Sequence, residues 1–250
     1  MKSYLRFFAI SLFFGLGCLV PAFAQIVSIQ SRYVPVENIK EFVHRETNYW
    51  SEVARRGIIE RRLARWELWQ IATGMNIDEG ANFFFIVEYR KPSDVDSNEE
   101  IWNFARVFSD MEASEIETRS LSTIVDQVYL YSQVHLIKSD PKVLRVNFAR
   151  ASDLGRYLEL ENTMWQEFVK ERMDSNQTNV VSWDLMSVMS PGGVDRSYNA
   201  LTIDGFEKLS DALQTSYGDN PNYPDLDQFR EVHEKGVTRI YTLVDAVRSP

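Results

Sequence analysis

Cysteine is almost absent from this 250-residue sequence, whose single thiol is Cys18. The first 24 residues carry the cations Lys2 and Arg6, then an apolar run, then the small-residue triplet Ala22-Phe23-Ala24. This order is typical of a secretory signal peptide cleaved after the triplet, so we expect a secreted or periplasmic protein. Cleavage would remove Cys18 as well. Disulfide bonds and a cysteine nucleophile are thereby excluded from the mature chain, which must be stabilised by its hydrophobic core.

Positive charge is scarce, because 27 Lys and Arg residues face 36 Asp and Glu residues and the net charge at pH 7 is −9. Loss of Lys2 and Arg6 with the signal peptide would lower the net charge by two, to −11. An acidic chain binds nucleic acid and anionic lipid poorly. We therefore expect no nucleic-acid partner and no membrane association after cleavage, and the composition leaves the oligomeric state open.

Histidine is also rare, with three copies at positions 44, 135 and 233. They are scattered along the chain. None has the spacing of a zinc site or the His-Glu pairing of a metalloprotease. We therefore predict neither a bound metal nor a cofactor.

The sequence contains an internal repeat. Residues 39–53, IKEFVHRETNYWSEV, align with residues 154–168, LGRYLELENTMWQEF, after a shift of 115 positions. Further on, residues 65–68, RWEL, align with residues 182–185, SWDL, after a shift of 117 positions. We interpret this similarity as two copies of one module. The alignment pairs Glu46 with Glu161, Trp50 with Trp165 and Trp66 with Trp183.

Each copy is predicted to contain a strand, a helix, two strands, a helix and a strand. The strand predictions rest on β-branched and aromatic runs with alternation. The second helix of the first copy begins with a predicted capping box, in which Ser97 and Glu100 satisfy the first backbone amides. In the first copy we predict strands at 26–34, 63–72, 82–89 and 125–136 and helices at 36–55 and 98–113.

This element order resembles the ferredoxin-like β-α-β-β-α-β motif. A tandem pair resembles the dimeric α+β barrel superfamily, which includes antibiotic-biosynthesis monooxygenase-like and NIPSNAP-like families. The resemblance implies an α+β fold of two tandem ferredoxin-like modules, whose sheets pack face to face as a pseudo-dimeric α+β barrel. It also implies a cavity between the sheets that binds a small, often aromatic, molecule. We expect a signal peptide at 1–24, modules at 25–137 and 142–250, and a linker at 138–141.

One carboxylate in each copy lies in the middle of an apolar helix stripe. On a helix, Glu46 shares a face with Phe42 and Trp50, and Glu161 occupies the matching position in the second copy. A buried carboxylate is costly without hydrogen-bonding or charged partners. Two interpretations stay open, namely a base or ligand anchor with a raised pKa and a structural hydrogen bond.

The tryptophans and one arginine are the candidate ligand-binding residues. Aromatic side chains at these spacings either form a ligand-facing wall or fill the core. Arg65 ends a basic stretch that begins at residue 55, and it could bind an anion or pair with surface carboxylates. The set comprises Trp50, Trp66, Trp165, Trp183 and Arg65.

Three functions remain compatible with these residues. The first is binding of a small, possibly aromatic, molecule in a barrel cavity. The second is a cofactor-independent oxygenase or isomerase that uses a cavity glutamate, Glu46 or Glu161, as its base. The third is a non-catalytic interaction scaffold. The sequence alone leaves open whether the protein is an enzyme.

Overall fold

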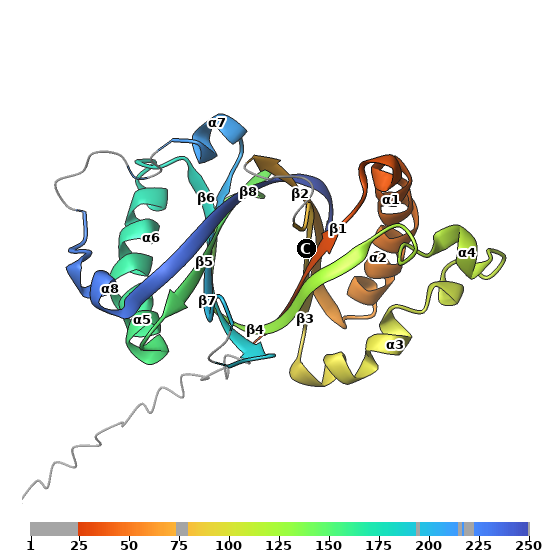
Figure 1. The fold of residues 1–250 in the computed structure, drawn as a ribbon, viewed down its shortest axis with the longest axis horizontal. Coiled ribbons are helices and arrows are strands. Elements are labelled where there is room, and N and C mark those ends of the chain that lie inside the picture. Colours follow the sequence, from red (N-terminus) through yellow and green to blue (C-terminus); the bar gives the residue numbers. More distant parts are fainter. Residues whose placement is uncertain (1–24, 74–79, 194–195, 215–216, 218–222, 250) are drawn as a thin grey trace, which may run out of the picture.

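The computed structural model describes residues 25–73, 80–193, 196–214, 217 and 223–249. The predicted signal peptide lies outside these residues. Within these ranges, eight strands close into one antiparallel barrel in the order β1-β3-β2-β8-β5-β7-β6-β4 (Figure 1). The strands are β1 (Ile26–Tyr33), β2 (Leu63–Thr73), β3 (Phe83–Tyr89), β4 (Thr123–Ile137), β5 (Val143–Ala151), β6 (Val180–Ser190), β7 (Ala200–Phe206) and β8 (His233–Arg248).

Helices cover the barrel on two opposite sides, one set from each half of the chain (Figure 1). None of the helices in the described ranges is long and apolar enough to cross a membrane. The first half contains η1 (Val36–Asn38), α1 (Ile39–Arg45), η2 (Glu46–Trp50), α2 (Ser51–Ile59), η3 (Pro92–Ser97), α3 (Asn98–Ile101), η4 (Phe104–Arg106) and α4 (Ala113–Ile116). The second half contains α5 (Leu154–Leu160), η5 (Glu161–Trp165), α6 (Gln166–Asp174), α7 (Leu209–Ala212) and α8 (Asp227–Val232).

The long strands β4 and β8 close the barrel by joining the two halves. β4 pairs with β1 of its own half and with β6 of the other half. β8 likewise pairs with β5 and with β2. The closed α+β barrel agrees with the expected fold class. Residues 138–141, the predicted linker, fall between the end of β4 and the start of β5.

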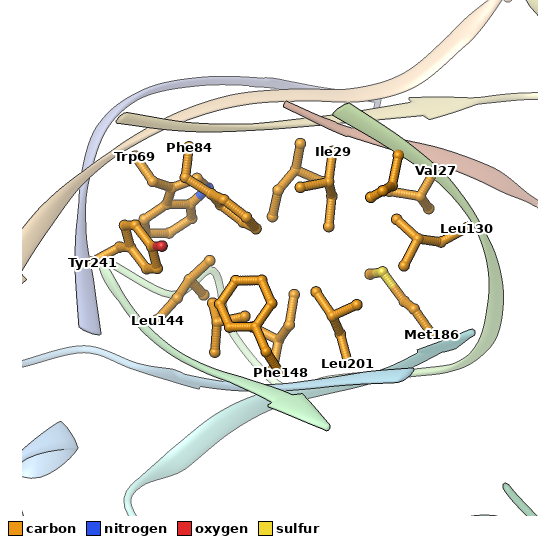
Figure 2. Packing of buried hydrophobic residues seen from close by; sticks show 14 of the residues in the cluster. Val27, Ile29, Trp69, Phe84, Leu130, Leu144, Phe148, Met186, Leu201 and Tyr241 are labelled. Carbon is orange, nitrogen blue, oxygen red and sulfur yellow. The ribbon is translucent and has the colours of Figure 1, made fainter. Parts of the chain in front are cut away.

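The interior of the barrel is filled by apolar side chains from all eight strands (Figure 2). Because alternate residues of a strand point to opposite faces, Val27 and Ile29 point inward while Ser28 points outward. This packing corrects one expectation, since the space between the sheets, where we expected a ligand cavity, is occupied by core. The labelled side chains are Val27, Ile29, Trp69, Phe84, Leu130, Leu144, Phe148, Met186, Leu201 and Tyr241.

The second helix predicted in the first half, at 98–113, is broken into short turns. Helix α3 ends at Ile101, and the Asn103 side chain then accepts a hydrogen bond from the amide of Ala105 at 3.1 Å. Asparagine favours such local bonds, which compete with a continuing helix. The predicted capping box is also wrong, because Ser97 makes no side-chain cap hydrogen bond.

Candidate functional site

Each half presents its glutamate from a widened helical turn. The backbone amide of Ser51 donates to the carbonyl of Glu46, five residues earlier, and the amide of Gln166 donates to that of Glu161. Such π-helical turns are rare and occur frequently at functional sites. Here the two turns, η2 and η5, begin at the two aligned glutamates and end at the two aligned tryptophans, Trp50 and Trp165.

Polar side chains bond to the carbonyls of the turn before each π-helical segment. Thr47 donates from Oγ1 to the carbonyl of Val43 at 2.8 Å, and Asn162 donates from Nδ2 to that of Leu158 at 2.8 Å. The next residues repeat the arrangement, since Asn48 bonds to the carbonyl of His44 and Thr163 to that of Glu159. Both turns share a glutamate followed by two polar residues, and sequence reasoning missed this common pattern.

The first-half pocket has a volume of about 640 Å³ and lies between η2 and the outer face of the sheet. Glu46 lines it and is only 4% exposed. Burial raises the pKa of Glu46 to about 7, although the Arg32 charge and a hydrogen bond from Thr118 oppose the rise. The aromatic side chains that line this pocket are Trp50, Trp66, Phe85, Tyr89, Trp102 and Phe104.

Glu46 is linked to a cation through a hydroxyl group. Arg32 Nη1 donates to Thr118 Oγ1 at 3.1 Å, and Thr118 Oγ1 donates to Glu46 Oε1 at 2.8 Å. The direct distance from Arg32 Nη1 to Glu46 Oε1 is longer, 3.8 Å. Sequence reasoning missed both partners, because Thr118 lies 72 residues from Glu46 and only the closed sheet brings Arg32 beside them.

The second-half pocket has a volume of about 720 Å³ and lies against η5 and α8 on the opposite side of the barrel. Residues of β5 and β7 that point away from the barrel interior form its floor, among them Arg145, Thr202 and Asp204. Its volume falls within the range of small-molecule sites. Aromatic side chains again dominate the walls, namely Tyr157, Trp165, Tyr217, Tyr223 and Phe229.

Glu161 lines the second-half pocket, and the described residues place no cation against it. Burial raises the pKa of Glu161 to about 7, a hydrogen bond from Tyr157 opposes the rise, and the negative charge of Asp204 adds to it. Asp204 itself is held by Arg145 Nη2 at 2.9 Å and by the Tyr217 hydroxyl at 2.8 Å. Within the described part of the chain, Glu161 Oε2 is buried and has no hydrogen-bond partner.

Two of the predicted ligand-binding residues lie away from both pockets. Trp183 is fully buried in the core beneath α6 and lines neither of them. Arg65 is partly buried, with Nε 3.2 Å from Glu88 and Nη2 3.8 Å from Asp184. Trp50 and Trp66 line the first-half pocket, and Trp165 lines the second-half pocket. Ligand binding by these five residues stays a prediction.

Arg65 belongs to an ionic cluster between the two halves. His135 Nδ1 lies 2.6 Å from Asp184 Oδ1, and Arg248 Nε lies 2.7 Å from Glu67 Oε1. The hydrogen bond to Asp184 raises the pKa of His135, and burial opposes the rise. The described residues offer no group of three or more His, Cys, Asp or Glu side chains that could hold a metal ion.

The fold is similar to that of several solved structures. One is a protein from Lactobacillus acidophilus NCFM provisionally assigned as a monooxygenase, with a TM-score of 0.62, 10% identity and coverage of 90% of this chain and 96% of that one. A second, from Fusobacterium nucleatum subsp. nucleatum ATCC 25586, has the same provisional assignment, with a TM-score of 0.57, 8% identity and coverage of 91% and 95%.

An anthrone oxidase-like protein is also similar, with a TM-score of 0.54, 8% identity and coverage of 90% of this chain and 93% of that chain. No protein-family model matches the sequence, and comparison with curated proteins finds no match. At these low identities the structural likeness shows the α+β barrel fold alone.

Proposed function

We propose that this protein binds a small planar aromatic molecule that carries a hydroxyl group, and that the site is the second-half pocket. The observation that carries the proposal is the carboxyl group of Glu161, which lines an aromatic pocket while one of its oxygen atoms has no partner among the described residues. A buried polar group without a partner is costly, and a ligand hydroxyl would remove that cost.

The walls of this pocket suit a flat ring. The Trp165 ring centroid lies 5.2 Å from that of Tyr217 and 5.6 Å from that of Tyr223, both in edge-to-face orientation. Phe229 adds a third edge-to-face contact at 6.4 Å. Aromatic pairs with these separations attract one another, so a planar ligand placed among them gains the same contacts.

The carboxyl group can turn toward such a ligand at little cost. The last torsion of a glutamate side chain is broad and roughly two-fold, so the carboxyl group can adjust to a ligand hydroxyl without moving the helix. A hydrogen bond to a charged group contributes about 1.5–3 kcal/mol, which corresponds to roughly a tenfold to hundredfold gain in affinity. The hydroxyl group of the ligand should therefore distinguish it from an otherwise similar aromatic molecule.

The proposal can be tested by titrating the full mature chain with 2-naphthol and with naphthalene. We expect 2-naphthol to bind at least about tenfold more tightly, and Glu161→Leu to abolish that preference while naphthalene binding persists. Glu46→Leu removes the aligned carboxyl group in the other pocket and is the matched control, which should keep the preference. Equal affinities for the two probes in the wild-type protein, or a preference that survives in Glu161→Leu, would refute the proposal.

A second candidate function is proton transfer by Glu161 to or from an aromatic substrate. The observation that favours it is the pKa of Glu161 near 7, because a general base works best when its pKa is close to the operating pH. The structurally similar proteins with provisional monooxygenase assignments are compatible with this chemistry. Turnover of a bound phenol under air, absent from Glu161→Gln, would distinguish an enzyme from a binding protein.

The two halves support the further proposal that the barrel arose from two tandem ferredoxin-like modules. Aligned positions share the glutamate, the π-helical turn that begins there, and the tryptophan that ends it. The tryptophans also occupy related environments, since Trp50 and Trp165 each line the pocket that holds the glutamate of their own segment. Separate expression of residues 25–141 should give a folded homodimer if one module can form both halves of the barrel.

We also propose that the protein is exported and that its mature chain begins at Gln25. The support is the order of charges, apolar residues and small residues in the first 24 positions. Amino-terminal sequencing of protein recovered from the host envelope or medium should begin at residue 25. Recovery of an uncleaved chain from the cytoplasm would contradict the proposal.

A further inference from the structure

We infer that the first-half pocket is a second binding site, which takes an aromatic carboxylate on the guanidinium group of Arg32 and couples its binding to protonation of Glu46. The inference does not depend on the second-half pocket, because the helices that line the two pockets cover opposite sides of the barrel (Figure 1). The guanidinium group of Arg32 has hydrogen-bonding capacity that the described residues do not use.

The Arg32 guanidinium is held in place on two of its three nitrogen atoms. Nε donates to Gln30 Oε1, while Nη1 donates to Thr118 Oγ1 at 3.1 Å and to Ser122 Oγ at 3.3 Å. Phe85 supports the group from below, with its ring centroid 5.1 Å from the guanidinium carbon. Nη2 makes no hydrogen bond to any residue that the structure describes. A fixed guanidinium with a free edge is well suited to bind a carboxylate.

A neighbouring amide can supply a second donor. Gln127 Oε1 accepts from Gln30 Nε2 at 3.1 Å, and this bond leaves the Gln127 Nε2 group free of hydrogen bonds among the described residues. Both Gln127 and Arg32 line the pocket. Since a carboxylate has two oxygen atoms that accept hydrogen bonds, it can use the guanidinium and the amide together.

The rest of the pocket fits an aromatic ring. Trp50 and Trp102 lie with ring centroids 6.4 Å apart, and Trp66 and Phe85 lie 6.2 Å apart. The Trp50 indole is fixed by a hydrogen bond from Nε1 to the carbonyl of Ile116 at 3.1 Å. Walls of this kind bury an apolar body while a small number of polar groups orient it.

The charged groups around Glu46 determine how strongly the pocket binds an anion. Among the residues that the structure describes, Arg32 on β1 and Glu46 on η2 are the charged groups inside the pocket. Tyr89 on β3 stays neutral because burial raises its pKa to about 12. Glu99 on α3 and Arg119 after α4 are exposed at the rim, and Glu117 is partly exposed there. Solvent screens these rim charges, so the balance between Arg32 and Glu46 controls anion binding.

That balance depends on the protonation of Glu46. Charged Glu46 offsets the cation, whereas neutral Glu46 leaves the charge of Arg32 without compensation and available to a carboxylate ligand. Burial lowers the pKa of Arg32, and the negative charge of Glu46 opposes this shift. With the pKa of Glu46 at about 7, about nine-tenths of the protein is protonated there at pH 6 and about one-tenth at pH 8. Because apparent affinity scales with the competent fraction, lower pH should strengthen binding by up to about tenfold.

The experiment is calorimetric titration of the full mature chain with 2-naphthoate at pH 6 and pH 8. We expect about tenfold tighter binding at pH 6, with uptake of about half a proton at pH 7 when two buffers of different ionisation enthalpy are compared. Glu46→Gln makes the side chain permanently neutral and should bind at pH 8 about ten times more tightly than the wild-type protein. This variant gains affinity, so misfolding cannot imitate the expected result.

Three controls define the site and the outcomes that would overturn the inference. Arg32→Gln should lose 2-naphthoate binding, Glu161→Leu should retain it, and 2-naphthamide, which carries no charge, should bind with no dependence on pH. Wild-type affinity that is the same at pH 6 and pH 8, or Glu46→Gln that binds no more tightly at pH 8, would overturn the inference. The 2-naphthol preference of the other pocket is unaffected by either outcome, so the two proposals fail separately.

Discussion

The buried carboxyl group of Glu161 should make the protein less stable as the pH rises. Its pKa is about 7 in the folded protein, against an ordinary value of 4.5. A raised folded pKa means that the folded state binds more protons than the unfolded state between these values. The contribution of Glu161 to the free energy of unfolding is therefore fully present below about pH 4.5, and it is lost as the pH rises toward 7. The difference between the two pKa values corresponds to a loss of about 3 kcal/mol.

Urea denaturation at several pH values measures this loss directly. We expect Glu161→Gln, which stays neutral, to flatten the decline between pH 5 and pH 8 by about 2–3 kcal/mol. Glu167→Gln is the matched control, because Glu167 is exposed on the following helix α6 and stays solvated in both states. If Glu161→Gln and the wild-type protein lose stability with the same slope, the carboxyl group does not titrate as the burial indicates.

Three further changes test the core and the polar contacts. Phe84→Ala removes a fully buried ring from the barrel interior and should cost about 3–5 kcal/mol in urea denaturation, whereas a loss below 1 kcal/mol would mean a loosely filled barrel. Thr118→Val removes the hydroxyl that bonds to Glu46 and should lower the free energy of unfolding by about 1–3 kcal/mol. Its stability should also fall more steeply with rising pH than that of the wild-type protein. An unchanged slope of stability against pH would contradict the hydrogen bond between Thr118 and Glu46. Protonated His135 contributes stability that is present below pH 6.5 and is lost as the pH rises through its raised pKa, and His135→Gln should remove this contribution. Thermal denaturation from pH 6 to pH 9 measures the effect. A variant that matches the wild-type protein over this range would rule out a stabilising pair with Asp184.

Much of the barrel could be predicted from local patterns. Strand positions followed from alternating apolar residues, because strand residues face two different environments. The first helix was also predicted, but its π-helical turn was not, since the periodicity of an α-helix does not reveal one widened turn. The break within 98–113 was missed because the predicted start signal does not show that local hydrogen bonds, such as that of Asn103, replace the continuing helix.

The candidate site was predicted only in part. The two glutamates stood out because a carboxylate in an apolar stripe is costly, and both line pockets in the structure. Their partners could not be predicted, since Arg32, Thr118 and Asp204 are neighbours of the glutamates only after the sheet has formed. The position of the pockets was also unpredictable, because alternation shows that a strand has two faces without showing which of them is covered by helices.

The sequence by itself determined the strands, the first helix of each half, and the buried position of Glu46 and Glu161, because these follow from local periodicity and from the cost of burying charge. Only the tertiary structure decided that the barrel interior is filled and that the pockets lie outside it. It also decided that Glu46 faces a cation while Glu161 lies near Asp204. The physical reason is that electrostatic environment depends on contacts between distant strands, and these contacts are set by barrel closure rather than by any local run of residues.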